Sequence, residues 1–144
     1  MSFVENRKAY FNYEIKDIYE AGIELLGFEV KSVRAGKVSL DGSHVIVRGG
    51  EAYIVGMTIQ PYQVKNTPAS YEPDRTRRLL LVKKEIVELE KLGETKGLTI
   101  VPLKMYNKNR RIKVELGVGK GKKLHDKRES IKKRDLDRQM KRDL

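Results

Sequence analysis

The stretch FNYEIKDIYEAGIEL, residues 11–25, decides the fold, because apolar and polar residues alternate along most of its length. The odd positions carry Phe11, Tyr13, Ile15, Tyr19, Ala21, Ile23 and Leu25. A period of two with aromatic and β-branched residues is typical of a strand, so we predict one long strand, bent at Asp17 or Gly22. The competing interpretation is a helix with the stripe Ile15, Ile18, Tyr19, Ile23 and Leu26. The alternation favours the strand.

Two other stretches have the signature of β-hairpins. HVIVRGGEAYIVG (44–56) places apolar runs on both sides of the turn-forming pair Gly49 and Gly50. LTIVPLKMYNKNRRIKVELGV (98–118) does the same around a polar turn at residues 107–110. These hairpins add four strands to the first one.

Two helices are expected between the strands. GFEVKSVRAGK (27–37) supports one or two helical turns that end at Gly36. Residues 61–74 contain three prolines and are expected to form a loop. Asp74 then serves as the N-cap of a longer helix that ends near Gly93. Its apolar stripe is formed by Leu79, Val82, Ile86 and Leu89.

This order of elements predicts a mainly β fold with helices and without βαβ alternation. We expect a small closed antiparallel barrel of the oligonucleotide-binding type with packed helices, formed by residues 1–118. A ferredoxin-like sheet is the alternative. Residues 119–144 form a separate basic tail.

Composition points to a polyanionic partner. The 144 residues carry a net charge of +11, and the sequence pI is about 9.8. The chain has no cysteine, which excludes disulfides and thiolate zinc ligands and fits a reducing cytoplasm. No apolar run has the length of a signal peptide or a membrane span. We therefore expect a cytoplasmic protein that binds nucleic acid and no membrane.

The tail holds much of this charge. Residues 119–144 contain eleven Lys or Arg and five Asp or Glu, a net charge of +6. Its few apolar residues cannot offset the entropy of ordering the chain, roughly 1–2 kcal/mol per backbone residue. We expect the tail to be disordered alone and to become helical against a polyanion that neutralises it.

Residue types for catalysis are scarce, whereas basic residues form two clusters. The two histidines, His44 and His125, lie far apart and have no cysteine partners, so we expect no metal, no cofactor and no catalytic site. The first cluster consists of Arg75, Arg77, Arg78, Lys83 and Lys84. The second consists of Lys104, Lys108, Arg110, Arg111 and Lys113, with Tyr106 among them. Aromatic rings among cations suit stacking on unpaired bases, while Lys and Arg hold phosphates.

Four motifs occur in an order that resembles a known family. They are NRKAYFNY, YEAGIELLGFEVKSVRAGKVSL, DRTRRLLL and GVGKGKKLHDKR. On them the chain resembles the SsrA-binding protein (small protein B) family, the bacterial partners of transfer-messenger RNA, from Asn6 to Arg128. The last sixteen residues match in character only, being basic with helical potential.

The resemblance implies a fold and a function. The fold is the closed oligonucleotide-binding barrel with packed helices. The family binds the tRNA-like domain of transfer-messenger RNA, assists its charging with alanine by alanyl-tRNA synthetase, and accompanies it with elongation factor Tu to stalled ribosomes. There the tail occupies the small-subunit decoding centre and the empty mRNA channel as a helix. The protein itself is not an enzyme.

The resemblance also implies site residues. RNA contacts are expected at Asn6, Glu20 and Leu80, with Lys31 and Arg34 adding charge, and the first basic cluster contributes Arg75, Arg77 and Arg78. Glu20 is unusual beside phosphate; it either accepts hydrogen bonds from base amino groups or holds neighbouring basic residues in place. Leu80 either contacts RNA or packs in the core. Decoding-centre contacts are expected at Lys122, Lys123, His125, Asp126, Lys127 and Arg128.

Two other functions compete with this one. A structural ribosomal protein could thread such a tail into ribosomal RNA, and it would remain on ribosomes washed in high salt. An enzyme acting on RNA is disfavoured, because the sequence has no acid–base or metal constellation.

Overall fold

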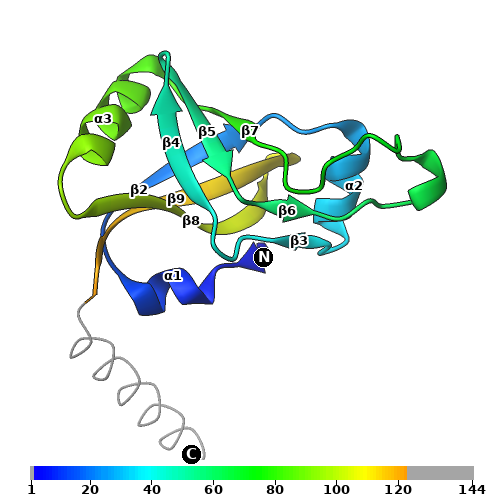
Figure 1. Ribbon diagram of the computed structural model, residues 1–144, viewed down its shortest axis with the longest axis horizontal. Helices are drawn as coiled ribbons and strands as arrows, with labels where there is room; N and C mark the ends of the chain where they lie inside the picture. The colour runs from blue at the N-terminus through cyan, green and yellow to red at the C-terminus, as the bar shows by residue number, and fades with distance from the viewer. Residues whose placement is uncertain (1, 123–144) are drawn as a thin grey trace, which may run out of the picture.

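The computed structural model describes residues 2–122, so every expectation for residues 123–144 lies outside the described part. The strands are β1 (Ser2–Glu5), β2 (Tyr13–Ile23), β3 (Val38–Ser39), β4 (His44–Arg48), β5 (Glu51–Val55), β6 (Thr58–Ile59), β7 (Arg77–Leu80), β8 (Leu98–Lys108) and β9 (Arg111–Gly121). The helices are α1 (Arg7–Asn12), α2 (Gly27–Arg34), α3 (Lys83–Glu94) and a short 3-10 turn, Val64–Asn66. Figure 1 shows this arrangement.

Seven strands form one antiparallel sheet in the order β1-β8-β9-β2-β7-β5-β4, and β3 pairs with β6 separately. The fold is therefore mainly β with helices around a large antiparallel sheet, which confirms the expected class. The hydrogen-bonded order leaves β1 and β4 as its two ends. Cα atoms of β4 nevertheless come within 8 Å of β8, so the sheet is strongly curved.

The long strand is confirmed, and the helical interpretation of residues 15–26 is wrong. β2 pairs with β9 from Tyr13↔Gly121 to Gly22↔Lys113. Its register shifts between Ile15 and Asp17, beside the first of the two positions, Asp17 and Gly22, at which a bend was expected. Phe11 belongs to α1, so the strand begins two residues later than the alternation indicated.

Both hairpins are confirmed, and both turn on pairs of residues with positive φ. Gly49 and Gly50 (φ 59° and 77°) join β4 to β5, where Arg48 pairs with Glu51. Asn109 and Arg110 (φ 51° and 65°) join β8 to β9, where Lys108 pairs with Arg111. A two-residue turn with positive φ at both positions matches the twist of the flanking strands.

The first helix is confirmed, but the start of the second was predicted wrongly. α2 spans Gly27–Arg34, and its chain reverses at Gly36 (φ 77°). The segment after Asp74 is not helical: Arg77–Leu80 form β7, and α3 begins only at Lys83. β7 pairs with both β5 and β2, and these distant partners override the local helical spacing.

The core has two parts, one on each side of the β8–β9–β2 region. The larger part lies between the curved sheet and the helices α2 and α3. On the other face, α1 covers a small cluster of Ala9, Val101 and Leu103, against which Tyr13 and Ile15 pack. Residues of β9 under α1 are therefore covered on both faces.

Gly119 has no room for a side chain in this covered region. A Cβ there would lie 2.8 Å from the Cβ of Tyr13 and 3.4 Å from the Glu14 carbonyl oxygen, and neither atom can move easily. We expect Gly119→Ala to lower the free energy of unfolding by about 1–3 kcal/mol, measured by urea denaturation. Gly121→Ala is the matched control, because nothing lies within 4 Å of its Cβ. Equal stability of the two variants would contradict this packing.

Among residues 2–122, no helix is long and apolar enough to cross a membrane.

Candidate nucleic-acid interface

One face of the strands β8, β9, β2 and β7 carries several cations, the two carboxylates Glu20 and Glu115, one aromatic ring and one exposed leucine. We call it the outer face and define it by Glu20, Leu80, Lys104, Tyr106 and Lys113. Contacts across neighbouring strands show that these side chains share one face. A Cβ built on Gly22, beside Glu20, would lie 3.2 Å from the Leu80 Cβ and 3.7 Å from Lys113 Nζ. Lys104 Nζ lies 5.5 Å from the centre of the Tyr106 ring.

Glu20 is the central acceptor of the outer face. It lies opposite Glu115 of β9 and reaches across that strand to β8. The Tyr106 hydroxyl donates to Glu20 Oε2, and Lys108 Nζ donates to Oε1 at 3.1 Å and to Oε2 at 3.3 Å. These bonds, first from Tyr106 and then from Lys108, hold the pKa of Glu20 below its usual value. Burial and the bond to Glu20 raise the pKa of Tyr106, so the pair is carboxylate and neutral phenol.

A groove borders the outer face where β2 meets the end of the β8–β9 hairpin. It encloses about 340 Å³, and its lining includes Gly22, Leu80 and Lys113. The apolar part of its lining is formed by Ile23, Leu25, Val30, Leu80 and Ile112, and the cations by Arg34, Arg110, Arg111 and Lys113. We call it the basic groove. Arg34 is held in place there: its Nη1 donates to Asn107 Oδ1 at 3.3 Å and its Nη2 to the Arg110 carbonyl at 3.2 Å.

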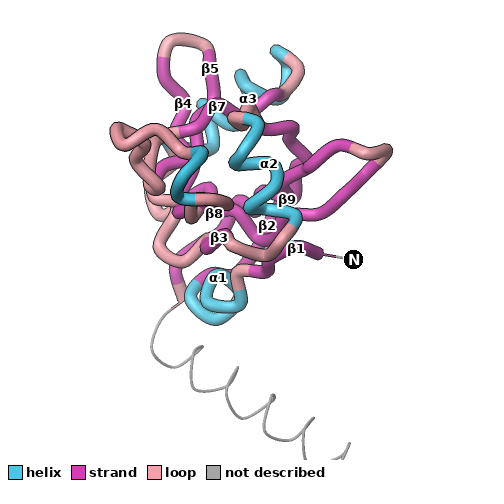
Figure 2. Tube along the Cα trace, turned by 90° about the vertical axis from the view of Figure 1, so that its right-hand side faces the viewer, coloured by secondary structure: helices cyan, strands magenta, loops and turns pink. Residues whose placement is uncertain are grey.

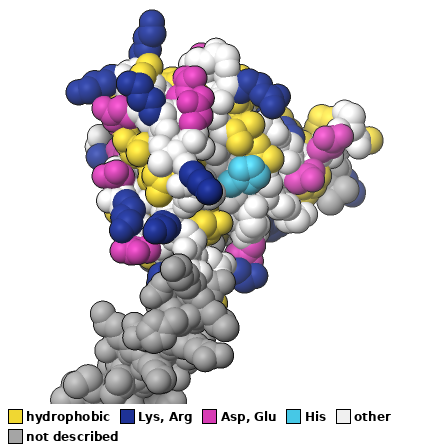
Figure 3. All heavy atoms as spheres, turned by 60° about the vertical axis from the view of Figure 1, so that its left-hand side comes forward, with side chains coloured by type: hydrophobic (Ala, Val, Ile, Leu, Met, Phe, Trp, Pro, Cys, Tyr) yellow, Lys and Arg dark blue, Asp and Glu magenta, His cyan; other side chains and the backbone are white. Residues whose placement is uncertain are grey.

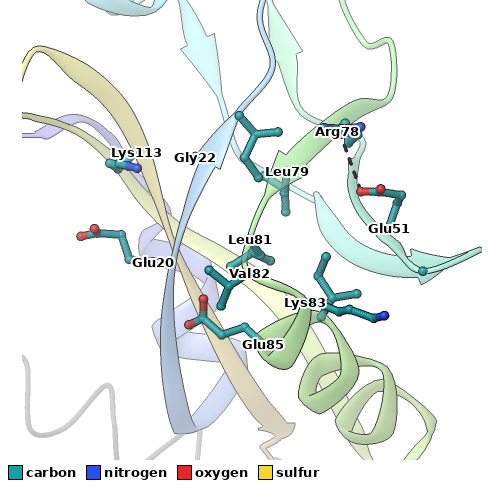
Figure 4. Close-up of a pocket in the computed structure, with 13 residues that line it drawn as sticks. Glu20, Gly22, Glu51, Arg78, Leu79, Leu81, Val82, Lys83, Glu85 and Lys113 are labelled. Carbon is teal, nitrogen blue, oxygen red and sulfur yellow. Dashed lines mark ion pairs between the residues drawn. The ribbon is translucent and has the colours of Figure 1, made fainter.

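A second and larger hollow, about 610 Å³, lies on the other side of Leu80, towards α3. Figure 4 shows Glu20 and Lys113 to one side of β2, with Arg78 and Glu51 to the other. Arg78 pairs with Glu51 at 3.9 Å and with Glu24 at 3.5 Å. Leu80 is 44% exposed. Of the two positions left open by the sequence, the surface and the core, the structure therefore places it on the surface.

The fold divides the first basic cluster: Arg78, Lys83 and Lys84 are exposed, whereas Arg75 and Arg77 bind an acidic residue of α2. Arg77 is fully buried, and its Nε and Nη2 donate to Glu29 Oε2 of α2 at 2.8 and 2.6 Å. Arg75 also pairs with Glu29, through Oε1 and Oε2. The Tyr71 hydroxyl lies 2.9 Å from the same carboxylate. Arg77 is therefore a core residue in this structure, and its expected position at the start of a helix was wrong.

The ion pairs outweigh the cost of burying Glu29. Burial alone raises the pKa of this carboxyl group, but hydrogen bonds from Arg75, from the Leu26 amide and from Arg77 together hold it below its usual value. Arg77 Nη1 also donates to the Met57 carbonyl, and its Nη2 to the Pro73 carbonyl, each at 2.8 Å. The cluster thus fastens the proline-containing loop before β7 to α2.

Asn6 is buried beside the β8 edge of the outer face, where its backbone N–H donates to the Leu103 carbonyl at 2.8 Å. Figures 1 and 2 place β1 and α1 at one end of the body, and β4, β5 and β7 at the other. Asn6, between β1 and α1, is 4% exposed; its Nδ2 donates to the Pro102 carbonyl at 2.9 Å, and its Oδ1 is buried without a partner. Lys31, on α2, is exposed. The structure brings Glu20, Leu80 and Arg34 to one region and leaves Asn6 outside it.

The folded part extends beyond the expected boundary of the tail. β9 continues to Gly121, so Gly119 and Lys120 belong to the sheet. The backbone N–H of Lys122 donates to the Asn12 carbonyl at 2.9 Å, and its Nζ to the Tyr10 carbonyl at 3.0 Å. Lys123, His125, Asp126, Lys127 and Arg128 lie outside the described residues.

Charge on the body is mixed. On the face that Figure 3 presents, Lys and Arg side chains are interspersed with acidic and apolar ones. The basic groove was only partly anticipated: the second cluster named Arg110, Arg111 and Lys113, but their proximity to Arg34 depends on the fold. Within residues 2–122, no group of three His, Cys, Asp or Glu is placed to hold a metal ion.

Comparison with known proteins decides the family. The family model described as SmpB protein matches residues 3–144. The chain belongs to the SmpB family. The SsrA-binding protein of Elusimicrobium minutum is 58% identical over 139 residues, covering 96% of this chain and 88% of that protein. The SsrA-binding protein of Gloeothece citriformis is 51% identical, covering 96% and 89%.

A solved structure agrees with this SmpB assignment. The chain matches one from the structure titled "tmRNA-SmpB: a journey to the center of the bacterial ribosome", with 49% identity and a TM-score of 0.70. The match covers 84% of this chain and 85% of that one. The resemblance recognised in the four sequence motifs is thereby confirmed over nearly the whole chain.

Proposed function

We propose that this protein binds the tRNA-like domain of transfer-messenger RNA and acts in ribosome rescue by trans-translation. Membership of the SmpB family and the likeness to a protein solved with transfer-messenger RNA support this function. The observation that carries it is the basic groove beside the outer face, where apolar side chains lie between four cations. Such a surface suits a folded RNA loop, since unstacked bases need apolar or aromatic contacts and their phosphates need Lys or Arg.

The contact residues follow from exposure. Arg34, Arg110, Arg111 and Lys113 hold phosphates, and Leu80 contacts a base or ribose. Lys31 and Arg78 add charge at the margins, although Arg78 is shared with Glu24 and Glu51. Arg75 and Arg77 act indirectly, by holding the loop before β7. Asn6 acts through the β8 carbonyls that it binds, or through a contact at its own end of the body.

The finer fold assignment belongs to the same proposal. The sheet closes into a barrel of the oligonucleotide-binding type, and the approach of β4 to within 8 Å of β8 supports closure. Closure would present the outer face on a rigid support.

The tail supplies the second half of the function. Residues 123–144 enter the small-subunit decoding centre and the empty mRNA channel, where His125 stacks on a base and Lys123, Lys127 and Arg128 hold phosphates. Asp126 belongs to the same segment. Alanyl-tRNA synthetase and elongation factor Tu act on the RNA, and the protein assists them in the cytoplasm without chemistry or a cofactor of its own.

The salt dependence of RNA binding tests the groove. Each phosphate held by a cation contributes about 0.7–0.9 to the slope of log affinity against log salt. We expect Arg111→Ala with Lys113→Ala to reduce the slope by about 1.4–1.8 for the tRNA-like domain. Filter retention between low and moderate salt, on the order of 50–200 mM, measures it.

The control is Lys91→Ala with Lys96→Ala, which removes the same charge outside the groove. Equal slopes for the two double variants would show that the groove does not hold the phosphates. If the wild-type protein instead remains on purified ribosomes after a high-salt wash, in one copy per ribosome, it is a structural ribosomal protein.

A further inference from the structure

Glu20 presents a problem for an RNA-binding surface, because a carboxylate repels phosphate. It lies on the exposed outer face and stays ionised, since its hydrogen bonds lower its pKa. Two explanations remain open from the sequence: it reads base amino groups, or it holds its neighbours in place. The hydrogen bonds of Glu20 favour the second explanation.

Both oxygens of Glu20 are already engaged. Oε2 accepts from the Tyr106 hydroxyl and from Lys108 at 3.3 Å, and Oε1 accepts from Lys108 at 3.1 Å. Each carboxylate oxygen can accept two hydrogen bonds, so Oε2 is filled and Oε1 keeps one free position. Two side chains of β8 therefore hold the carboxylate in place, and it holds them in turn.

Tyr106 is the side chain that this arrangement fixes. Its hydroxyl is held by Glu20, and Lys104 lies 5.5 Å from its ring centre. Lys113 is its register partner on β9. The half-buried ring thus has one ammonium group over it, that of Lys104, which also pairs with Glu115 of β9 at 3.9 Å.

We propose that Tyr106 is a stacking site for one unpaired base, with Lys108 holding the adjoining phosphate, and that Glu20 is the positioning residue for both. The inference rests on the proposed function and names residues of its binding surface. It gives the carboxylate a favourable role: Glu20 restrains the ring and the lysine before RNA arrives, so less conformational entropy is lost on binding.

A double-mutant cycle tests the positioning. Glu20→Ala and Tyr106→Phe each remove the same hydrogen bond, and the second variant keeps the ring. We expect each to weaken binding of the tRNA-like domain about tenfold, as the loss of one charge-assisted hydrogen bond does. The double variant should bind no more than about twofold more weakly than Glu20→Ala, because interacting residues are not additive.

Two outcomes of the cycle would overturn the inference. If the losses multiply to about a hundredfold, Glu20 and Tyr106 act independently, as base reading by Glu20 requires. If Glu20→Ala binds as tightly as the wild type or more tightly, the carboxylate is merely repulsive. Circular dichroism establishes that each variant is folded.

Stacking has its own measurement, because the chain contains no tryptophan. The Tyr106→Trp variant carries a single fluorescent reporter on the outer face, and the Tyr10→Trp variant carries a control reporter on α1. We expect the tryptophan fluorescence of Tyr106→Trp to be quenched as RNA saturates the protein. The fluorescence of Tyr10→Trp should change much less.

The two proposals fail differently. Unquenched fluorescence from Tyr106→Trp, in a protein that still retains RNA on a filter, would refute stacking and leave the proposed function intact. Failure of the wild-type protein to bind the tRNA-like domain would refute the proposed function itself.

Discussion

Removing residues 123–144 is expected to abolish peptide tagging on stalled ribosomes while leaving most of the affinity for transfer-messenger RNA. The cut preserves β9 and both hydrogen bonds of Lys122 to α1, so the body should fold normally. The outer face and the basic groove remain complete. The proposed contact of the tail with the decoding centre is lost, so tagging should fall to background. The assay is transfer of the tag to a nascent chain on ribosomes programmed with a truncated message.

A milder variant gives the matched comparison. His125→Ala removes one proposed stacking contact, worth roughly 1–3 kcal/mol, so tagging should slow without disappearing. RNA affinity, measured by filter retention, should stay near the wild-type value in His125→Ala. The truncated protein should lose only the nonspecific affinity that the charge of the tail contributes. Normal tagging by the truncated protein would contradict the proposed role of the tail.

The largest expected effect on stability comes from Glu29→Ala. This change leaves the fully buried guanidinium of Arg77 without its carboxylate. Breaking a buried pair in this way costs about 3–5 kcal/mol, since one charge stays buried and uncompensated. Urea denaturation followed by circular dichroism measures the free energy of unfolding. The double change Glu29→Ala with Arg77→Met should recover part of the loss, because no buried charge is then left alone.

Glu24→Ala is the matched control. It removes the exposed ion pair with Arg78, which joins the segment before α2 to β7. We expect this change to lower the free energy of unfolding by no more than about 1 kcal/mol. The stabilisation that Glu29 provides also depends on pH. Its folded pKa is lowered, so the stabilisation is present at neutral pH and is lost as the pH falls through that value. A Glu29→Ala protein as stable as Glu24→Ala would contradict this account.

The sequence predicted those elements whose signals are local. The β4–β5 hairpin follows from Gly49 and Gly50, which adopt positive φ without strain. β2 follows from its alternation, and α2 from its glycine stop. In each case the residues that determine the element lie within it or beside it.

The errors arise where distant partners decide. Leu79 and Val82 have helical spacing with Ile86, yet Leu79 lies in a strand, with Arg77 and Leu79 buried and Arg78 and Leu80 exposed. That alternation is short, and only its pairing with β5 and β2 makes it a strand. The same pairing buries Arg77 against Glu29, 48 positions earlier in the chain. No property of Arg77 alone distinguishes it from an arginine that binds RNA.

The candidate site was predicted in part for the same reason. A cluster of cations around Tyr106 is visible in the sequence, and the family motif names Glu20. Their contact joins positions 20 and 106 and depends on the order β8-β9-β2. Arg34 comes to the groove from α2 in the same way.

The central claim is that this protein selects transfer-messenger RNA from all the RNA in a cell. The most direct measurement is to recover the full-length protein from a bacterial lysate and sequence the RNA that accompanies it. The account predicts one dominant species, transfer-messenger RNA, depleted when Arg111 and Lys113 are both changed to alanine. Recovery of ribosomal RNA in equimolar amounts, without enrichment of transfer-messenger RNA, would contradict it.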